Sequence, residues 1–185
     1  MTSQRIGKYA CLETERRYLL SKIPDVLLDK PEGWFITDRY FANTRLRLRH
    51  MKSVTEDEHI YKLTQKYRAE SQNPIETTIT NIYLTKQEYD FLEFLGGKMV
   101  KKTRYPYRAQ NHKFSIDVFE GRHKGLILAE LELDGQSGLA EDTLPWFALK
   151  EVTDDPFFTG GHLAIMTEQE FSLGLAKRLR DENSY

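Results

Sequence analysis

Two pairs of glutamates, each with one residue between its members, lie in segments with the period-two pattern of β-strands. Glu13 and Glu15 belong to LETERRYLL, and Glu130 and Glu132 belong to LILAELEL. Because successive side chains of a strand point to opposite faces, each pair projects from one face, and Arg17 shares the face of Glu13 and Glu15. Two carboxylates that converge from one strand suit a hard divalent cation, which prefers oxygen ligands. The glutamate pairs are therefore candidate metal ligands.

Basic residues recur with the same period in three further strand-like segments. Arginines that share one strand face repel each other unless an anion lies between them, and the planar guanidinium group matches the oxygens of a phosphate. These basic faces therefore predict a phosphate-bearing ligand. Their members are Arg45, Arg47 and Arg49 in TRLRLRH, Lys62 and Lys66 in HIYKLTQKY, and Lys102 and Arg104 in KKTRYPY.

The charged faces of all these segments together hold eight acids and eight bases, the acids beyond the two pairs being Glu76, Asp117, Glu151 and Asp155. Alternation alone fits either an outer sheet face or the lumen of a barrel. The general exposure of charged residues favours the outer face. The paired acids and clustered arginines favour the lumen, because a polyanion bound together with divalent metals would balance both kinds of charge there.

The composition indicates a single domain over residues 1–185, long enough to bury a core. A net charge of -1 gives no whole-molecule field that would favour nucleic acid or a membrane surface as a partner. The single Cys11 excludes an intramolecular disulfide and a cysteine-built metal site. The first nine residues, MTSQRIGKY, lack the apolar core of a signal peptide, and no apolar run reaches the ~20 residues that cross a bilayer. We therefore expect a soluble, cytoplasmic protein.

The elements that must position these residues are mostly strands, so the pattern predicts a mainly antiparallel β body with a few helices. A short helix is expected in 21–30. Two longer helices are predicted by capping boxes, Thr85 with Glu88 before a stop at Gly96, and Thr167 with Glu170 in the segment 167–182. The predicted strands are 12–20, 34–41, 44–50, 59–67, 74–84, 101–107, 114–120, 126–133 and 149–155.

The histidines show no metal-ligand spacing along the chain, and metal-binding histidines normally cluster. We expect all of them to be surface or loop residues. They are His50, His59, His112, His123 and His162.

Seven short motifs, in this order, resemble the CYTH domain, or triphosphate tunnel metalloenzyme, family over nearly the whole chain. No single motif is specific, but their order and spacing are hard to obtain by chance. They are a Glu-x-Glu-x-Lys strand with Arg17 in the last place, DRYFANTRLRLR (38–49), Thr64 with Lys66, the KTRY segment 102–105, IDVF (116–119), AELEL (129–133), and EVT with a following acid (151–155).

The resemblance implies a mainly β (α+β) fold, an eight-stranded antiparallel β-barrel that forms an open tunnel with helices packed outside. By resemblance, Mg²⁺ or Mn²⁺ would be the cofactor, and the metal ligands would be Glu13, Glu15, Glu76, Asp117, Glu130, Glu132 and Asp155, with Glu151 as a further residue of the shell. The substrate-binding residues would be Arg45, Arg47, Lys62, Lys66, Lys102 and Arg104, and the catalytic residues would be Glu13, Glu15, Arg17 and Lys102.

The leading expectation is divalent-metal-dependent hydrolysis of inorganic triphosphate (tripolyphosphate) or of a small organic triphosphate. Two alternatives stay open: an adenylyl cyclase that converts ATP to cyclic AMP, and a catalytically weak phosphate-binding module. The partner is expected to be a small-molecule triphosphate, and a homodimer is compatible with the resemblance.

Two residues depart from the family pattern. Arg17 replaces a lysine of the opening motif, and arginine cannot take part in proton transfer. Thr78 stands where the family carries a second acid, two residues after Glu76. Both departures make the catalytically weak phosphate-binding module a plausible alternative to the hydrolase.

Overall fold

The computed structural model describes residues 8–29, 32–67, 75–133 and 143–180. Parts of three predicted segments, residue 30, residue 74 and residues 181–182, lie outside these ranges. Nine strands occur in the described chain: β1 Cys11–Leu19, β2 Trp34–Tyr40, β3 Leu46–Ser53, β4 His59–Tyr67, β5 Glu76–Leu84, β6 Lys98–Ala109, β7 His112–Phe119, β8 Ile127–Glu132 and β9 Lys150–Glu151. The helical elements are η1 Asp25–Leu27, α1 Lys86–Glu93, η2 Gly121–His123, η3 Pro156–Phe158, α2 Gly160–Ile165 and α3 Glu168–Arg180.

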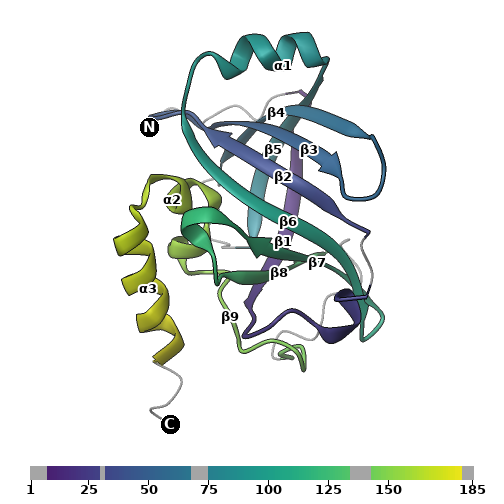
Figure 1. The fold of residues 1–185 in the computed structure, drawn as a ribbon, viewed down its shortest axis with the longest axis vertical. Coiled ribbons are helices and arrows are strands. Elements are labelled where there is room, and N and C mark those ends of the chain that lie inside the picture. The colour runs from purple at the N-terminus through teal and green to yellow at the C-terminus, as the bar shows by residue number, and fades with distance from the viewer. Residues whose placement is uncertain (1–7, 30–31, 68–74, 134–142, 181–185) are drawn as a thin grey trace.

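Eight of these strands form a closed antiparallel barrel in the order β5-β4-β3-β2-β6-β7-β8-β1 (Figure 1). Strand β1 closes it, because its first half, from Cys11 to Thr14, pairs with β5 and its second half, from Glu15 to Leu19, pairs with β8. The short β9 pairs antiparallel with the end of β1, at Tyr18 and Leu19. A closed barrel leaves no exposed sheet edge among these eight strands. The predicted eight-stranded antiparallel barrel is thus confirmed.

The pairing register decides which residues face the lumen. Directly opposed residues of neighbouring antiparallel strands point to the same side of the sheet. Glu15 lies opposite Glu132, and Arg17 lies opposite Glu130. The same face continues across β7, β6, β2, β3 and β4, and it carries the predicted basic residues Arg47, Arg49, Lys62, Lys66, Lys102 and Arg104.

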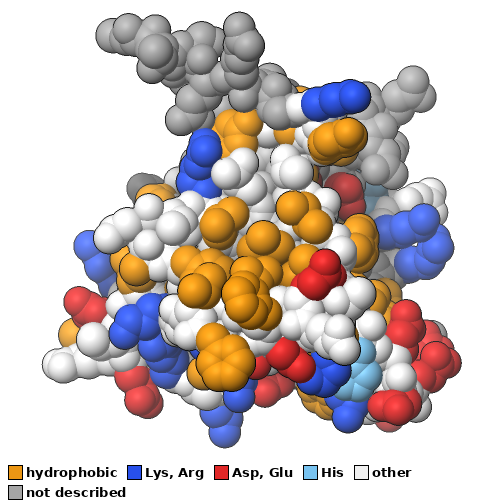
Figure 2. Space-filling model, turned by 90° about the horizontal axis from the view of Figure 1, so that it is seen from above, with side chains coloured by type: hydrophobic (Ala, Val, Ile, Leu, Met, Phe, Trp, Pro, Cys, Tyr) orange, Lys and Arg blue, Asp and Glu red, His pale blue; other side chains and the backbone are white. Residues whose placement is uncertain are grey.

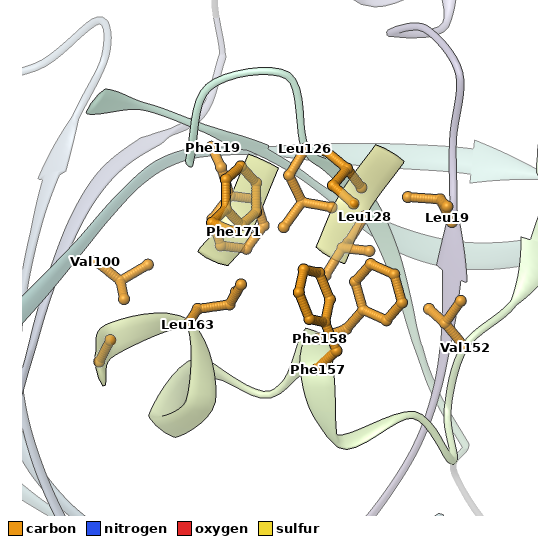
Figure 3. Packing of buried hydrophobic residues seen from close by; sticks show 12 residues of the cluster. Leu19, Val100, Phe119, Leu126, Leu128, Val152, Phe157, Phe158, Leu163 and Phe171 are labelled. Carbon is orange, nitrogen blue, oxygen red and sulfur yellow. The ribbon is translucent and has the colours of Figure 1, made fainter. Parts of the chain in front are cut away.

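One end of the barrel interior is apolar. On the lumen face, Leu19 is the next residue after Arg17 along β1, and Leu128 is the one before Glu130 along β8. Figure 3 shows them packed with Phe158 of η3 and Leu163 of α2, and all four side chains are almost fully buried. The helical segment after β9 therefore covers this end of the barrel, and the apolar layer separates it from the charged interior.

A second apolar cluster covers the outer face of β1, β6, β7 and β8. Its buried members include Tyr18, Phe114 and Leu131, and η1 contributes Leu27. Glu15, Arg17 and Glu130 thus lie on the face opposite Tyr18 and Leu131, as the alternation of both segments predicts.

Helix α1 lies on the outside of β3, β4 and β5. Its capping box is present, with the Thr85 side chain accepting from the Glu88 backbone N–H. Figure 2 views the molecule from the α1 side and shows apolar side chains gathered on this face. Phe91 and Phe94, on and next to α1, are exposed there. None of the helices in the described ranges is long and apolar enough to span a membrane.

Several expectations about local structure were wrong. The segment 149–155 is a strand only over Lys150–Glu151. In the described part of 21–30, residues 21–29, the only helical element is the single turn η1. The short helix α2 was missed, because its sequence begins with Gly160 and Gly161, which are poor helix formers. His123 is buried rather than exposed, since it packs between Phe119 and Phe171.

Candidate active site

The barrel encloses a cavity of about 370 Å³ whose lining is strongly basic. An excess of three positive charges over the described lining residues contrasts with the net charge of -1 for the whole chain. Seven bases and four acids line the cavity: Arg17, Arg45, Arg47, Arg49, Lys66, Lys102 and Arg104, against Glu13, Glu15, Asp38 and Glu130.

The two carboxylates of the first glutamate pair converge on a single ammonium group. Lys66 Nζ donates to Glu13 Oε2 at 2.7 Å and to Glu15 Oε1 at 3.1 Å. Arg17 Nη2 lies 3.4 Å from the same oxygen of Glu15. The pair can therefore share one cation, as the spacing in β1 predicts.

A second charged group surrounds Asp117, which is completely buried. Arg104 donates to its two carboxylate oxygens from Nε and Nη2, each at 2.7 Å, and Lys102 pairs with it as well. Arg104 also pairs with Glu130, so one guanidinium group joins β6 to both β7 and β8. Asp117 thereby holds two basic side chains in fixed positions at the cavity wall.

The charges within this group set the protonation states of Glu130 and Lys102. Burial alone would raise the pKa of Glu130, but the positive charges of Arg104 and Lys102 outweigh burial and hold it well below its usual range. Burial lowers the pKa of Lys102, and the charge of Asp117 opposes that effect. Glu130 is therefore a carboxylate, and so a potential cation ligand, at any pH near neutrality.

A third charged pair was not predicted from the sequence. Arg49 donates to the buried carboxylate of Asp38 from Nε at 2.6 Å and from Nη2 at 2.7 Å. Arg47 Nε lies 3.6 Å from the same carboxylate, and Arg47 Nη2 donates to Thr64 at 3.2 Å. Burial would raise the pKa of Asp38, but Arg49 and Arg47 lower it below its usual range. The feature of the sequence that could have predicted this pair is the position of Asp38 between Ile36 and Tyr40 on one face of a predicted strand.

Two arginines in the cavity wall have a buried nitrogen that no group in the described chain accepts from, the Nε atoms of Arg17 and Arg47. A buried donor without an acceptor is costly. An anion in the cavity would supply the acceptor. Arg45, the residue before β3, lines the same cavity, and its guanidinium group lies 4.5 Å from the ring centroid of Tyr67.

The end of the cavity nearest the apolar layer is formed by η3 and the start of α2. Phe158, Thr159, Gly160 and Gly161 line it, and Arg17 Nη1 lies 3.4 Å from the Phe158 carbonyl oxygen. The barrel is therefore not open throughout its length, since apolar side chains fill this end. Gly160 allows close approach here, because a Cβ at this position would overlap the hydroxyl of Tyr40.

Some predicted site residues lie away from the cavity. Lys62 has the lumen-facing register of β4, but its ammonium group lies 5.0 Å from the ring centroid of Tyr83, outside the cavity lining. Glu132 faces the same side as Glu15 but is exposed and is not among the lining residues.

Two predicted metal ligands, Glu76 and Asp155, are not part of this site. Glu76 lies opposite Thr14, on the outer face, because Thr77 and Ile79 take the inward positions of β5. Thr78 is on that outer face too, so it does not replace a ligand in the cavity. Asp155 caps the Phe157 N–H and pairs with Arg178 of α3.

Glu151, expected as a further shell residue, is also outside the cavity. It pairs with Arg16 of β1, whose side chain points to the face opposite Arg17. Of the predicted metal ligands, Glu13, Glu15 and Glu130 line the cavity, and the buried Asp117 contacts two of its bases.

A closed antiparallel barrel with basic and acidic clusters on its inner face defines a β-barrel protein with a charged internal cavity. No family model matches the chain. An inorganic triphosphatase of Nitrosomonas europaea is 29% identical over 159 residues, which cover 83% of this chain and 97% of that protein. An inorganic triphosphatase of Acetivibrio thermocellus is 29% identical over 98 residues, 48% of this chain and 62% of the relative, so the chain matches less than two thirds of that protein.

Among solved structures, the crystal structure of the inorganic triphosphatase NE1496 has a TM-score of 0.53 and 24% identity. The match covers 84% of this chain and 95% of that one. This similarity shows the fold. The sequence motifs, the closed barrel and the two relatives together confirm the resemblance of the chain to the CYTH domain, or triphosphate tunnel metalloenzyme, family.

Proposed function

We propose that the protein is a divalent-metal-dependent triphosphatase that hydrolyses inorganic triphosphate (tripolyphosphate), or a small organic triphosphate, in the barrel cavity. The observation that carries the proposal is the enclosed excess of positive charge around converging carboxylates. The names of the two relatives support it.

The bases of the cavity bind the phosphate groups. Arg17 and Arg47 have buried Nε donors that need an acceptor, and Arg45, Lys66, Lys102 and Arg104 line the same space. Guanidinium groups bind phosphate oxygens through paired hydrogen bonds, and lysines act as point charges. Bases spread over the four strands β1, β3, β4 and β6 match a chain of phosphates better than a single phosphate.

The acids of the cavity suit Mg²⁺ or Mn²⁺. Glu13 and Glu15 already direct one oxygen each at a shared cation, the Lys66 ammonium group. The described residues contain no cluster of three or more carboxylate or imidazole groups placed to hold a metal by themselves. Mg²⁺ is typically bound by one or two carboxylates, waters and substrate phosphates, so this set fits it. We assign Glu13 and Glu15 to the metal, and Glu130, on the neighbouring strand β8, faces the same cavity.

The metal, when bound, would lower the pKa of a coordinated water and neutralise phosphate charge. The residues of the chain orient the substrate and stabilise developing charge. Asp117 fixes Lys102 and Arg104 before substrate arrives, so they need no reorganisation as charge builds on the phosphate oxygens. The apolar layer beneath Arg17 excludes water from that end of the site.

The test is phosphate release from inorganic triphosphate, ATP and thiamine triphosphate with Mg²⁺ or Mn²⁺, beside a sample with EDTA. We expect metal-dependent release, with inorganic triphosphate among the substrates. Cyclic AMP formed from ATP without phosphate release would show a cyclase instead. A rise in melting temperature with triphosphate but no turnover would show a binding module and overturn the proposal.

A further inference from the structure

Lys66 occupies the point at which the carboxylates of Glu13 and Glu15 converge. It belongs to β4, whereas both glutamates belong to β1, and β5 lies between these strands. Lys66 therefore reaches across one strand to make both contacts, at 2.7 and 3.1 Å. The three side chains are only 12–31% exposed, so solvent screens these contacts less than those of a surface pair.

A divalent cation at the point where these two carboxylates converge would lie within contact distance of the Lys66 ammonium group, and the two positive charges would repel each other there. A metal bound by Glu13 and Glu15 must therefore displace the Lys66 ammonium group. The long stem of lysine permits such a movement, since its charge is carried on four rotatable bonds.

The displaced ammonium group has no favourable place in the cavity unless an anion is present. Six other bases line the cavity, and the buried Nε donors of Arg17 and Arg47 have no acceptor within the described chain. A triphosphate among these bases supplies acceptor oxygens. The energy lost when Lys66 leaves the glutamates is then recovered at the phosphate.

We propose that Lys66 is an internal counter-cation of the metal site, which makes metal binding and triphosphate binding support each other. Metal alone binds weakly because it must displace Lys66, and triphosphate strengthens metal binding because it accepts the displaced group. Such a coupling is reciprocal for the two ligands. The identity of the second ligand rests on the proposed function, whereas the competition between Lys66 and the metal does not.

The experiment measures Mn²⁺ binding by electron paramagnetic resonance in wild type and in Lys66→Met, first without any phosphate compound. We expect the variant to bind Mn²⁺ roughly tenfold more tightly, the effect of removing a competing ion pair of about this exposure. Lys62→Met is the matched control, because it removes the same charge from the same face of β4 outside the cavity, and its Mn²⁺ affinity should equal that of wild type.

The second measurement adds imidotriphosphate, a triphosphate analogue with nitrogen bridges. We expect it to raise the Mn²⁺ affinity of wild type, and to raise that of Lys66→Met by a smaller factor. Because it uses wild type, this arm remains decisive if the variant does not fold. An Mn²⁺ affinity of wild type that is the same with and without the analogue would overturn the proposal.

The outcomes separate this inference from the proposed function. If wild type hydrolyses triphosphate but Lys66→Met binds Mn²⁺ equally or more weakly, the counter-cation role is wrong and the hydrolase stands. If Lys66→Met binds Mn²⁺ more tightly but wild type releases no phosphate, the competition is supported and the hydrolase is wrong. No Mn²⁺ binding by either protein would contradict the counter-cation role.

Discussion

Asp38 of β2 accepts two hydrogen bonds from the guanidinium group of Arg49 on β3, at 2.6 and 2.7 Å, and both residues are buried. They are directly opposed in the pairing of the two strands, so the backbone register brings them together. Arg47, two residues earlier on β3, lies 3.6 Å from the same carboxylate. Asp38 therefore orients two of the arginines that line the cavity.

Removing one partner of this pair should destabilise the fold strongly. Asp38→Asn leaves Arg49 as a buried charge without its counter-charge, which costs roughly 3–5 kcal/mol, and Arg49→Gln should cost a similar amount. The double variant should lose much less than the sum of the two, because it leaves no uncompensated charge. Urea denaturation of all four proteins measures this. Additive losses would show that the two side chains do not act as a pair.

Gly160 and Gly161 provide a matched pair of substitutions at the start of α2. A Cβ on Gly160 would overlap the Tyr40 hydroxyl and lie 2.8 Å from its ring carbon Cζ, whereas a Cβ on Gly161 would meet no atom within 4 Å. Gly160→Ala should therefore cost about 1–3 kcal/mol and raise the KM for triphosphate, since Tyr40 lines the cavity. Gly161→Ala should be neutral or stabilising by up to ~1 kcal/mol. Equal melting temperatures and KM values for the two variants would contradict this.

The period-two pattern predicted most strands and the residues that share each face, because the alternation of side chains is fixed by strand geometry. It predicted that Glu13, Glu15 and Arg17 lie together, and they do. It could not predict the strand register, and a shift of one residue exchanges the two faces. Glu76 illustrates the limit: the pairing of β5 with β1 turns it outward and Thr77 inward.

Other features depended on contacts between distant parts of the chain. Asp155 follows a strand-like segment, but its partner Arg178 is 23 residues away on α3, so local spacing gave no sign of that pair. The apolar layer that fills one end of the barrel combines Leu19 and Leu128 with Phe158 and Leu163, from elements whose contact the sequence does not specify. The burial of His123 follows from the same packing.

His123 should make the protein less stable as the pH falls below neutrality. Burial lowers the pKa of His123 below the ordinary 6.5. Its Nε2 lies 2.8 Å from the Leu163 carbonyl oxygen, so the neutral ring carries its hydrogen on Nε2 and donates it to that oxygen. Between the folded pKa and about 6.5, the unfolded chain binds a proton that the folded chain does not, so stability falls as pH decreases through this range.

The test compares urea denaturation of wild type and His123→Gln at about pH 7.5 and about pH 5.5, on either side of the ordinary histidine pKa. Glutamine keeps a donor for the Leu163 carbonyl but does not titrate. The variant should lose less stability than wild type on acidification. His123→Gln should still lose some stability on acidification, because burial and the neighbouring His59 also lower the pKa of His50. An identical loss in both proteins would exclude His123 as its source.

Glu130→Gln should abolish most of the metal-dependent turnover without unfolding the barrel. The substitution keeps the shape of the side chain but removes the negative charge that faces Arg104, Lys102 and Arg17. Arg104 keeps its two hydrogen bonds to Asp117, so no buried charge loses its only partner. We expect kcat to fall by about 10²–10³, the usual effect of removing one electrostatic group from an active site, with little change in melting temperature.

Glu132→Gln is the control for this prediction, since Glu132 has the same lumen-facing register on β8 but is exposed and lies outside the cavity lining. Its kcat should remain within a few-fold of wild type. Phosphate release with Mg²⁺ and thermal denaturation of both variants distinguish the cases. Wild-type activity in Glu130→Gln would remove this carboxylate from the mechanism, and Glu13 and Glu15 would then be the remaining glutamates of the described cavity lining that could act on the metal.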